Sequence, residues 1–263
     1  MGMKHLSDYI YQYLTNGKYF FTKAEALSAL GLRVEQFRYQ AYRLLNKGLI
    51  RHLTRDSFMI IPAEYQNFGG IPPHWVIDSL MRYLGQDYYV ALLSAAGIYG
   101  ATHQQPMTFQ VITEKKRRPI KLERGNITFH LFKECASSTK EQLSSPAGYV
   151  QISTKEQTML DLVRFYQSSG YLSNVAMVIK DLAESANKAA FINTISKERN
   201  NTVLQRLGFI LDYVGFKDLA HIVQQSLYKR KIQFVLLNPD IRAREGERDS
   251  RFKIIINDFL EIE

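Results

Sequence analysis

Two glycines placed to end short helices, Gly31 and Gly48, constrain the fold of this chain more than any other feature of its sequence. Thr22 has the side chain of an N-cap, and Glu25 three residues later completes a capping-box pattern. The helix that starts there is expected to stop at Gly31, because glycine readily adopts the left-handed conformation that ends helices. A second helix then spans about residues 34–47 and ends at Gly48. Two short helices joined by a glycine-containing turn indicate a helix-turn-helix.

The second of these helices has one apolar face and one polar, basic face. Apolar side chains recur at helical spacing at Val34, Phe37, Ala41, Leu44 and Leu45. The candidate DNA-binding residues on and beside the other face are Arg33, Gln36, Tyr39, Gln40, Arg43, Asn46 and Lys47. Long donors and acceptors of this kind suit base edges, and only one acid, Glu35, lies on the helix. The pattern predicts a recognition helix.

A β-hairpin is expected directly after this helix. Residues 49–53 and 58–61 are two β-prone runs, and the polar residues 54–57 connect them. The candidate DNA contacts of the hairpin are Arg51, His52 and Arg55. A hairpin in this position is the wing of a winged helix. The alternative interpretation is a pair of helices whose polar face is merely solvated.

A winged helix-turn-helix DNA-binding domain is therefore expected over residues 1–66, with a first helix at about residues 6–14. This segment holds nine Lys and Arg against five Asp and Glu, which leaves a net charge of about +4. Residues 67–73 contain two glycines and two prolines, which break regular structure and predict a linker. Residues 74–263 are expected to form the second, larger domain.

The second domain is predicted to be of mixed α+β class, with strands before and after a helical block. Helices are expected at about residues 74–84, 87–99, 172–184, 187–198, 199–211 and 216–227, and in a segment that Ser153 or Thr154 caps and that reaches Phe165. Strands are expected at residues 108–113, 126–132, 149–153, 233–237 and 252–257, with a short one around 120–122 and a charged loop at 242–251.

Charge and composition narrow the class of protein. The net charge of +9 and the pI near 9.4 favour a polyanionic partner. A single cysteine, Cys135, excludes an intramolecular disulfide and is interpreted as a small buried hydrophobe in a cytoplasmic protein. No apolar run approaches the length of a membrane helix, so a soluble protein without a membrane partner is expected. No glycine-rich phosphate loop and no Cys/His spacing occurs, so neither a cofactor nor a metal is predicted.

Three groups of side chains leave other interpretations open. His103 either orients a ligand or caps the end of a helix. A metal-dependent nuclease needs fixed carboxylates, and the candidate acids are Asp240, Glu245, Glu247, Asp249 and Asp258. Interleaved arginines are expected to pair with these acids instead.

A run of basic residues also leaves its role open. It consists of Lys115, Lys116, Arg117 and Arg118, and it forms either a solvated loop or additional contacts to phosphates or to an acidic partner.

Three segments behind the winged helix carry a family resemblance. They run from Leu93 to Pro106, from Ile152 to Leu162, and from Leu237 through Arg251 to Asn257. In this order they resemble the AbiEi-type antitoxins of bacterial type IV toxin–antitoxin systems, which are linked to abortive phage infection. The resemblance covers nearly the whole chain. It offers no catalytic residue set that could be transferred to this sequence, so no enzymatic activity is expected.

The resemblance implies two functions. The N-terminal winged helix would act as a transcriptional autorepressor that binds inverted repeats in its own promoter. The C-terminal domain would counteract a nucleotidyltransferase-like toxin without forming a stable complex with it. Two alternatives come from other classes: a nuclease or nucleotide-processing enzyme targeted by the winged helix, and a protein-interaction module.

Overall fold

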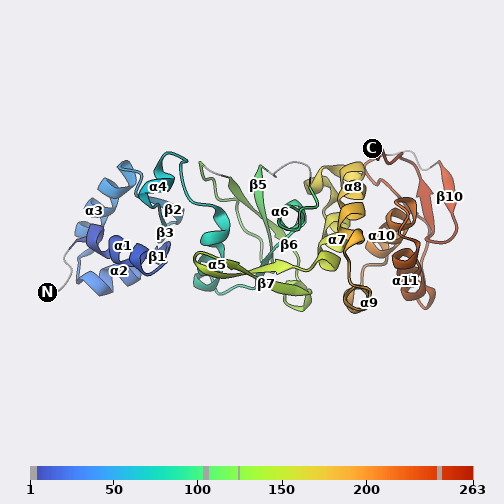
Figure 1. Cartoon of the computed structure of the whole chain (residues 1–263), viewed down its shortest axis with the longest axis horizontal. Helices are drawn as coiled ribbons and strands as arrows, with labels where there is room; N and C mark the ends of the chain where they lie inside the picture. Colours follow the sequence, from blue (N-terminus) through green and yellow to red (C-terminus); the bar gives the residue numbers. More distant parts are fainter. Residues whose placement is uncertain (1–4, 103–106, 124, 242–244, 263) are drawn as a thin grey trace. The chain divides into compact units, whose positions relative to one another are not determined.

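The computed structural model describes residues 5–102, 107–123, 125–241 and 245–262 (Figure 1). Contacts between Cα atoms group the chain into two compact units. The first unit comprises residues 1–89, 107–133 and 142–151, and the second comprises residues 90–106, 134–141 and 152–263. Within the described residues, no helix has the length and apolar character needed to cross a membrane.

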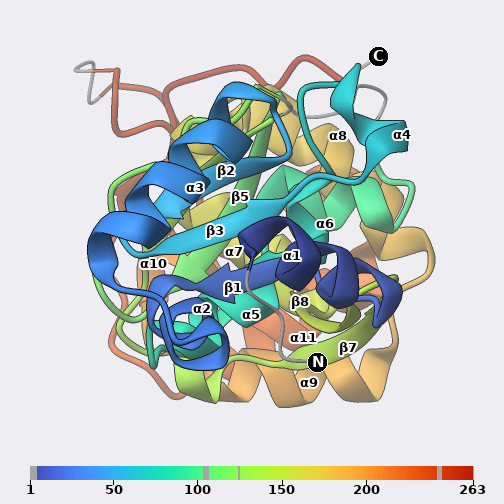
Figure 2. The same cartoon turned by 90° about the vertical axis from the view of Figure 1, so that its left-hand side faces the viewer.

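The first unit begins with the elements of a winged helix. Their order is α1 (Leu6–Thr15), β1 (Phe20–Thr22), α2 (Lys23–Leu30), α3 (Val34–Asn46), β2 (Ile50–Thr54) and β3 (Ser57–Ile60). The strands form an antiparallel sheet in the order β1-β3-β2, which Figure 2 shows with β3 in the middle. Strand β1 was not expected from the sequence. It gives the sheet a third strand, which an isolated hairpin lacks.

The predicted ends of the two helices are confirmed. The hydroxyl of Thr22 accepts a hydrogen bond from the Glu25 backbone N–H at 3.2 Å, and Glu25 Oε2 accepts one from the Thr22 N–H at 2.7 Å. Gly31 and Gly48 both have positive φ angles, of 60° and 68°. A side chain at either position would strain the backbone, so these glycines set the angle at which α3 leaves α2 and enters the hairpin.

Residues 67–73 are only partly exposed, because Asn67 and Phe68 are exposed whereas Gly70 and Ile71 are buried. Ile71 is fully buried, and the ring of Trp75 lies 4.8 Å from that of Tyr19 and 5.1 Å from that of Tyr65. The boundary predicted at residues 67–73 therefore falls inside the first unit. Whether residues 1–66 fold independently stays a prediction, because contacts in the whole chain do not test it.

The middle of the chain forms a five-stranded sheet in the order β6-β5-β4-β8-β7. Its strands are β4 (Tyr88–Val90), β5 (Thr108–Thr113), β6 (Asn126–Leu131), β7 (Lys140–Ser145) and β8 (Gly148–Ser153). The short helical elements here are α4 (Ala63–Gln66), a 3₁₀ turn at Pro73–Trp75, α5 (Ile77–Tyr83), α6 (Leu92–Ile98) and a 3₁₀ turn at Cys135–Ser137. Strands β5 and β6 pair in parallel, and Ile120 forms an isolated bridge to Ile127 in place of the short strand expected there.

The helix predicted at residues 87–99 is correct only in its second part. Its first part is strand β4, and α6 begins at Leu92, whose φ angle is +54°. Tyr88, Tyr89 and Val90 are β-prone residues buried inside the sheet. Sheet pairing therefore overrides the helical spacing that suggested one continuous helix.

The helical block of the second unit surrounds α7. Its helices are α7 (Lys155–Arg164), a 3₁₀ turn at Tyr166–Ser169, α8 (Tyr171–Glu184), α9 (Lys188–Lys197), α10 (Asn201–Tyr213) and α11 (Lys217–Tyr228). Helix α7 contacts α6, α8, α9 and α10 (Figure 1). The expected cap is Thr154, whose hydroxyl accepts from the Gln157 N–H at 3.3 Å.

A small sheet in the order β10-β11-β9 completes the chain. Its strands are β9 (Val235–Leu236), β10 (Glu247–Asp249) and β11 (Ile254–Ile256). Strands β9 and β11 are shorter than expected, and β11 begins only after Lys253, whose φ is +54°. Strand β10 lies where only a charged loop was expected. The Gln205 side-chain amide donates to the carbonyls of Gln233 and Phe252 at 2.8 and 2.9 Å, which ties α10 to this sheet. The Phe252 ring also packs on Gly208, where a Cβ would approach it to 2.3 Å.

Candidate functional site

Helix α3 presents a broad polar surface opposite its buried face. Phe37, Ala41 and Leu44 are at most 7% exposed and anchor the helix to the core of the winged helix. The exposed residues on and next to the helix are Arg33, Glu35, Gln36, Arg38, Tyr39, Tyr42, Arg43, Asn46 and Lys47. This set, which we call the α3 surface, includes six of the seven residues that the sequence nominated on the helix.

Two nominated glutamines already have hydrogen-bond partners inside the protein. Gln36 Oε1 accepts from the backbone N–H of Arg33 at 2.9 Å, so it caps the start of α3. Gln40 is half-buried, and its Oε1 accepts from the N–H of Leu6 at 2.6 Å. That bond satisfies an otherwise unpaired donor at the start of α1. Gln40 therefore joins α1 to α3, and its carbonyl oxygen is occupied.

Tyr39, Arg43, Asn46 and Lys47 are exposed, and none of them hydrogen-bonds to another described side chain. The Arg43 guanidinium lies 5.8 Å from the centre of the Tyr39 ring, within range of a cation–π interaction. Such a stack orients the guanidinium without using its N–H donors. Arg43 is therefore the best-oriented free donor of the predicted set.

The α3 surface also includes Arg38 and Tyr42, which the sequence interpretation missed. Both lie one residue beyond the buried positions Phe37 and Ala41, so they project from the edge of the helix that is turned toward the hairpin. They line a hollow of about 200 Å³ together with Lys23, His52, Arg55, Asp56 and Phe58. The signal that could have found them is their own spacing, because a cation and an aromatic four residues apart share one face of a helix.

Two of the nominated hairpin residues make hydrogen bonds or an ion pair within the part of the protein that the structure describes, and the third does not. Arg51 Nη1 donates to the carbonyl of Leu45 at 3.1 Å, and its Nη2 lies 2.7 Å from Glu123 Oε1. His52 Nδ1 lies 3.2 Å from the Thr54 carbonyl. Arg55 is exposed at the tip and has no ion pair with another described residue. Arg55 is thus the hairpin cation most readily available to a phosphate.

The basic run at residues 115–118 is not uniformly free. Arg117 Nε donates to Gln86 Oε1 at 2.6 Å, and burial lowers the pKa of the Arg117 guanidinium from its usual value. Lys115 lies 3.9 Å from Glu114. Lys116 and Arg118 are exposed. Only part of this run could contact an anionic partner without a rearrangement.

Three of the five acids considered for a nuclease accept hydrogen bonds from other groups of the protein. Asp240 accepts from the Gln167 amide at 2.9 Å, Asp249 Oδ1 from the Phe252 N–H at 2.6 Å, and Asp258 Oδ2 from the Asn238 amide at 2.6 Å. Across the described ranges, no three His, Cys, Asp or Glu side chains group as metal ligands. The remaining candidates, Glu245 and Glu247, are exposed, whereas His103, Arg242 and Arg244 lie outside the described residues.

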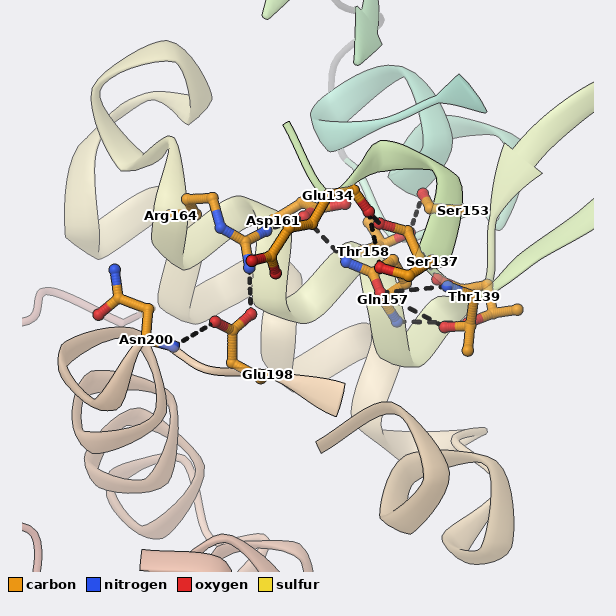
Figure 3. Close-up of polar contacts among 12 residues, drawn as sticks. Glu134, Ser137, Thr139, Ser153, Gln157, Thr158, Asp161, Arg164, Glu198 and Asn200 are labelled. Atoms are coloured by element: carbon orange, nitrogen blue, oxygen red, sulfur yellow. Dashed lines mark hydrogen bonds and ion pairs between the residues drawn. The ribbon is translucent and has the colours of Figure 1, made fainter. Parts of the chain in front are cut away.

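The second unit contains a buried ionic cluster around α7 (Figure 3). The Arg164 guanidinium pairs with Asp161 through Nη1 and with Glu198 through Nη2. The three side chains are 11%, 0% and 6% exposed, respectively. Glu198 also accepts from the Asn200 N–H at 2.7 Å, and Asp161 from the Gln157 amide at 3.0 Å. One cation therefore compensates two buried carboxylates, which link α7 to the segment before α10.

A chain of hydroxyl groups extends this cluster (Figure 3). The Thr139 hydroxyl lies 3.2 Å from that of Thr154 and 3.0 Å from that of Thr194, and Gln157 Oε1 accepts from the Thr139 N–H at 3.3 Å. The Ser153 hydroxyl lies 2.7 Å from that of Thr158. These residues satisfy one another, so the arrangement positions helices and offers no free nucleophile. The sequence interpretation assigned α7 a cap and apolar residues, and it did not anticipate the cluster.

The structure thus combines a winged helix that carries the basic α3 surface with an α+β part that contains a buried ionic cluster. Residues 89–213 match the family model of the AbiEi antitoxin C-terminal domain. This match, which covers just under half of the chain, supports the AbiEi-type antitoxin family that the sequence motifs indicated, and with it a general role as an antitoxin in a toxin–antitoxin system. A comparison with curated proteins finds no match.

The fold is shared with a solved structure. The crystal structure of the RV2827C protein from Mycobacterium tuberculosis matches with a TM-score of 0.66 and 16% sequence identity, over 94% of this chain and 89% of that chain. This likeness shows a common fold. A nucleotidyltransferase-like antigenic protein from Paracoccidioides brasiliensis matches 57% of this chain and 90% of its own, at 11% identity, but the TM-score of 0.35 supports no argument.

Proposed function

We propose that this protein represses transcription of its own operon by binding promoter DNA through the winged helix. The observation that carries this proposal is the α3 surface, where exposed arginine, tyrosine and asparagine side chains stand on a helix fixed by a buried apolar face. Arginine and asparagine can read base edges in the major groove, and Arg55 at the hairpin tip can contact a phosphate. Inverted repeats in the promoter are the proposed site.

We further propose that residues 74–263 supply the antitoxin function against a nucleotidyltransferase-like toxin encoded alongside. The match to the AbiEi antitoxin C-terminal domain supports this assignment. The proposed antitoxin acts in the cytoplasm, by a non-enzymatic route and without a stable complex with the toxin. A role in phage defence follows from the same family assignment. Magnesium-dependent cleavage of DNA by the purified protein would contradict this view.

The test separates the two functions with one double variant. Arg43→Ala with Asn46→Ala removes two exposed side chains of the α3 surface that make no hydrogen bond within the described protein. A promoter reporter should lose repression, while growth during toxin co-expression should still show protection. Lys188→Ala, an exposed cation on α9, serves as the control and should preserve both functions. Loss of protection in the double variant at unchanged protein level would show that protection depends on DNA binding.

Salt dependence provides the second measurement. Phosphate contacts release counterions, so affinity for the promoter should fall by orders of magnitude from low to moderate salt, roughly 10³-fold or more for several contacts. The double variant should lose preference for the promoter over random DNA. An affinity of the unaltered protein that does not change with salt would contradict DNA binding through this surface.

A further inference from the structure

The second unit contains an open hollow of about 530 Å³ beside the start of α10. Its lining residues are Glu134, Ser137, Ser196, Lys197, Glu198, Arg199, Asn201 and Arg230. The volume falls within the range of small-molecule sites, roughly 300–1,000 Å³. Nearly every lining side chain is polar or charged, so the hollow suits a charged ligand better than an apolar one.

Arg230 is a half-buried cation without a counter-ion among the described residues. Its Nη1 donates to the Glu198 carbonyl at 2.8 Å and to Asn201 Oδ1 at 3.2 Å, and its Nη2 donates to the Ser226 hydroxyl at 3.4 Å. All three acceptors are neutral. Removing a guanidinium from water without an opposite charge is unfavourable, and an anion in the hollow would relieve that cost.

The two acids of the hollow do not neutralise Arg230. The Glu198 carboxylate is turned to Arg164 and to the N–H of Asn200 (Figure 3). Arg230 is reached by the backbone carbonyl of Glu198. Glu134 lies 3.8 Å from Arg199. Lys197 is exposed and has no ion pair within the described part of the chain. Two cations of the hollow, Lys197 and Arg230, are therefore left without a carboxylate.

We propose that this hollow binds the phosphate group of a small phosphorylated molecule, with Arg230 and Lys197 as its cationic ligands. A guanidinium fork matches the oxygens of phosphate, and the Lys197 ammonium adds a second cation. The volume left beyond a phosphate accommodates an organic group. This site is independent of the proposed DNA-binding surface.

Isothermal titration calorimetry on the full chain tests this site with three probes at constant ionic strength: inorganic phosphate, adenosine monophosphate and adenosine. Inorganic phosphate and the nucleotide should bind, whereas adenosine should not. Tighter binding of the nucleotide than of phosphate would identify an organic phosphate ester as the better ligand. Equal binding of adenosine and its monophosphate, or no binding of any probe, overturns the proposal.

Matched variants distinguish a site from general attraction. Lys197→Ala should weaken nucleotide binding about tenfold, as expected for loss of one charged hydrogen bond. Lys217→Ala removes the same charge from an exposed position at the start of α11, outside the hollow, and should leave binding unchanged. Arg230→Lys keeps the charge but loses the fork, and should also weaken binding. Equal losses in Lys197→Ala and Lys217→Ala overturn the proposal.

Discussion

The α3 surface and the ionic cluster around α7 use similar side chains for opposite purposes. On α3, Arg43 stands over an exposed ring and has no carboxylate partner among the described residues. In the cluster, Arg164 is almost fully buried between two carboxylates. Charge that is compensated within the protein fixes the packing of helices, whereas uncompensated charge on a surface is available to an external anion.

The difference teaches that residue type alone does not identify a binding residue. Gln36 and Gln40 have the chemistry of base readers, yet their carbonyl oxygens accept from backbone N–H groups at the starts of two helices. Arg51 is likewise held by Glu123. The side chains available to bind another molecule are best identified by asking which of their hydrogen-bond donors and acceptors remain unused in the folded chain.

The largest effect is expected from Arg164→Met. This change leaves Asp161 and Glu198 as uncompensated buried charges, which should lower the free energy of unfolding by about 3–5 kcal/mol. The matched control is Lys188→Met, whose ion pair with Asp218 is exposed and should contribute little. Urea denaturation followed by circular dichroism measures both. Similar losses of unfolding free energy in the two variants would show that the buried ion pairs of Arg164 stabilise the fold no more than the exposed pair of Lys188.

A smaller effect is expected from Arg43→Ala, and it should appear in binding. Loss of a base contact should weaken binding to the promoter site by about 1–3 kcal/mol and reduce the preference over random DNA. Gln40→Ala provides the comparison, because it should lower the free energy of unfolding by about 1 kcal/mol and preserve that preference. Fluorescence anisotropy and urea denaturation on both variants separate the outcomes. If only Gln40→Ala lost the preference for the promoter over random DNA, then Gln40 and not Arg43 would be the residue that contacts the bases.

The smallest effect is expected from Glu123→Gln. Removal of this carboxylate frees Arg51 for a DNA phosphate, so binding to random DNA should strengthen by less than about 1 kcal/mol. Glu114→Gln is the control, since it changes net charge equally without touching Arg51. The slope of affinity against salt should steepen only in Glu123→Gln. If both variants bound random DNA more tightly by the same amount, the effect would be due to net charge and not to Arg51.

The sequence predicted features that depend on neighbours in the chain. Thr22, Glu25, Gly31 and Gly48 define the two helices of the helix-turn-helix, because capping and left-handed glycine act over three or four residues. Strand β1 was missed because three residues give too short a pattern, and β7 because most of its side chains are polar. Strand β1 owes its conformation to pairing with the distant strand β3, whereas β7 pairs with β8, the next strand in the chain.

The candidate sites depend on contacts between distant residues, which local patterns do not contain. Arg51 and Glu123 are separated by 72 positions, and Arg164 and Glu198 by 34. No spacing rule links such pairs in one sequence. The sequence could therefore nominate the polar side of α3, but it could not show which of those side chains are already occupied.

The contacts of α10 with the final sheet have a consequence for synthesis on the ribosome. The Gln205 amide finds its acceptors on Gln233 and Phe252, and the ring of Phe252 covers Gly208. The nascent chain cannot complete the packing of α10 until residues near its C-terminus have emerged. The packing of α10 is therefore completed only after residue 252 has been synthesised, whereas the winged helix has all its strands as soon as residue 60 is free.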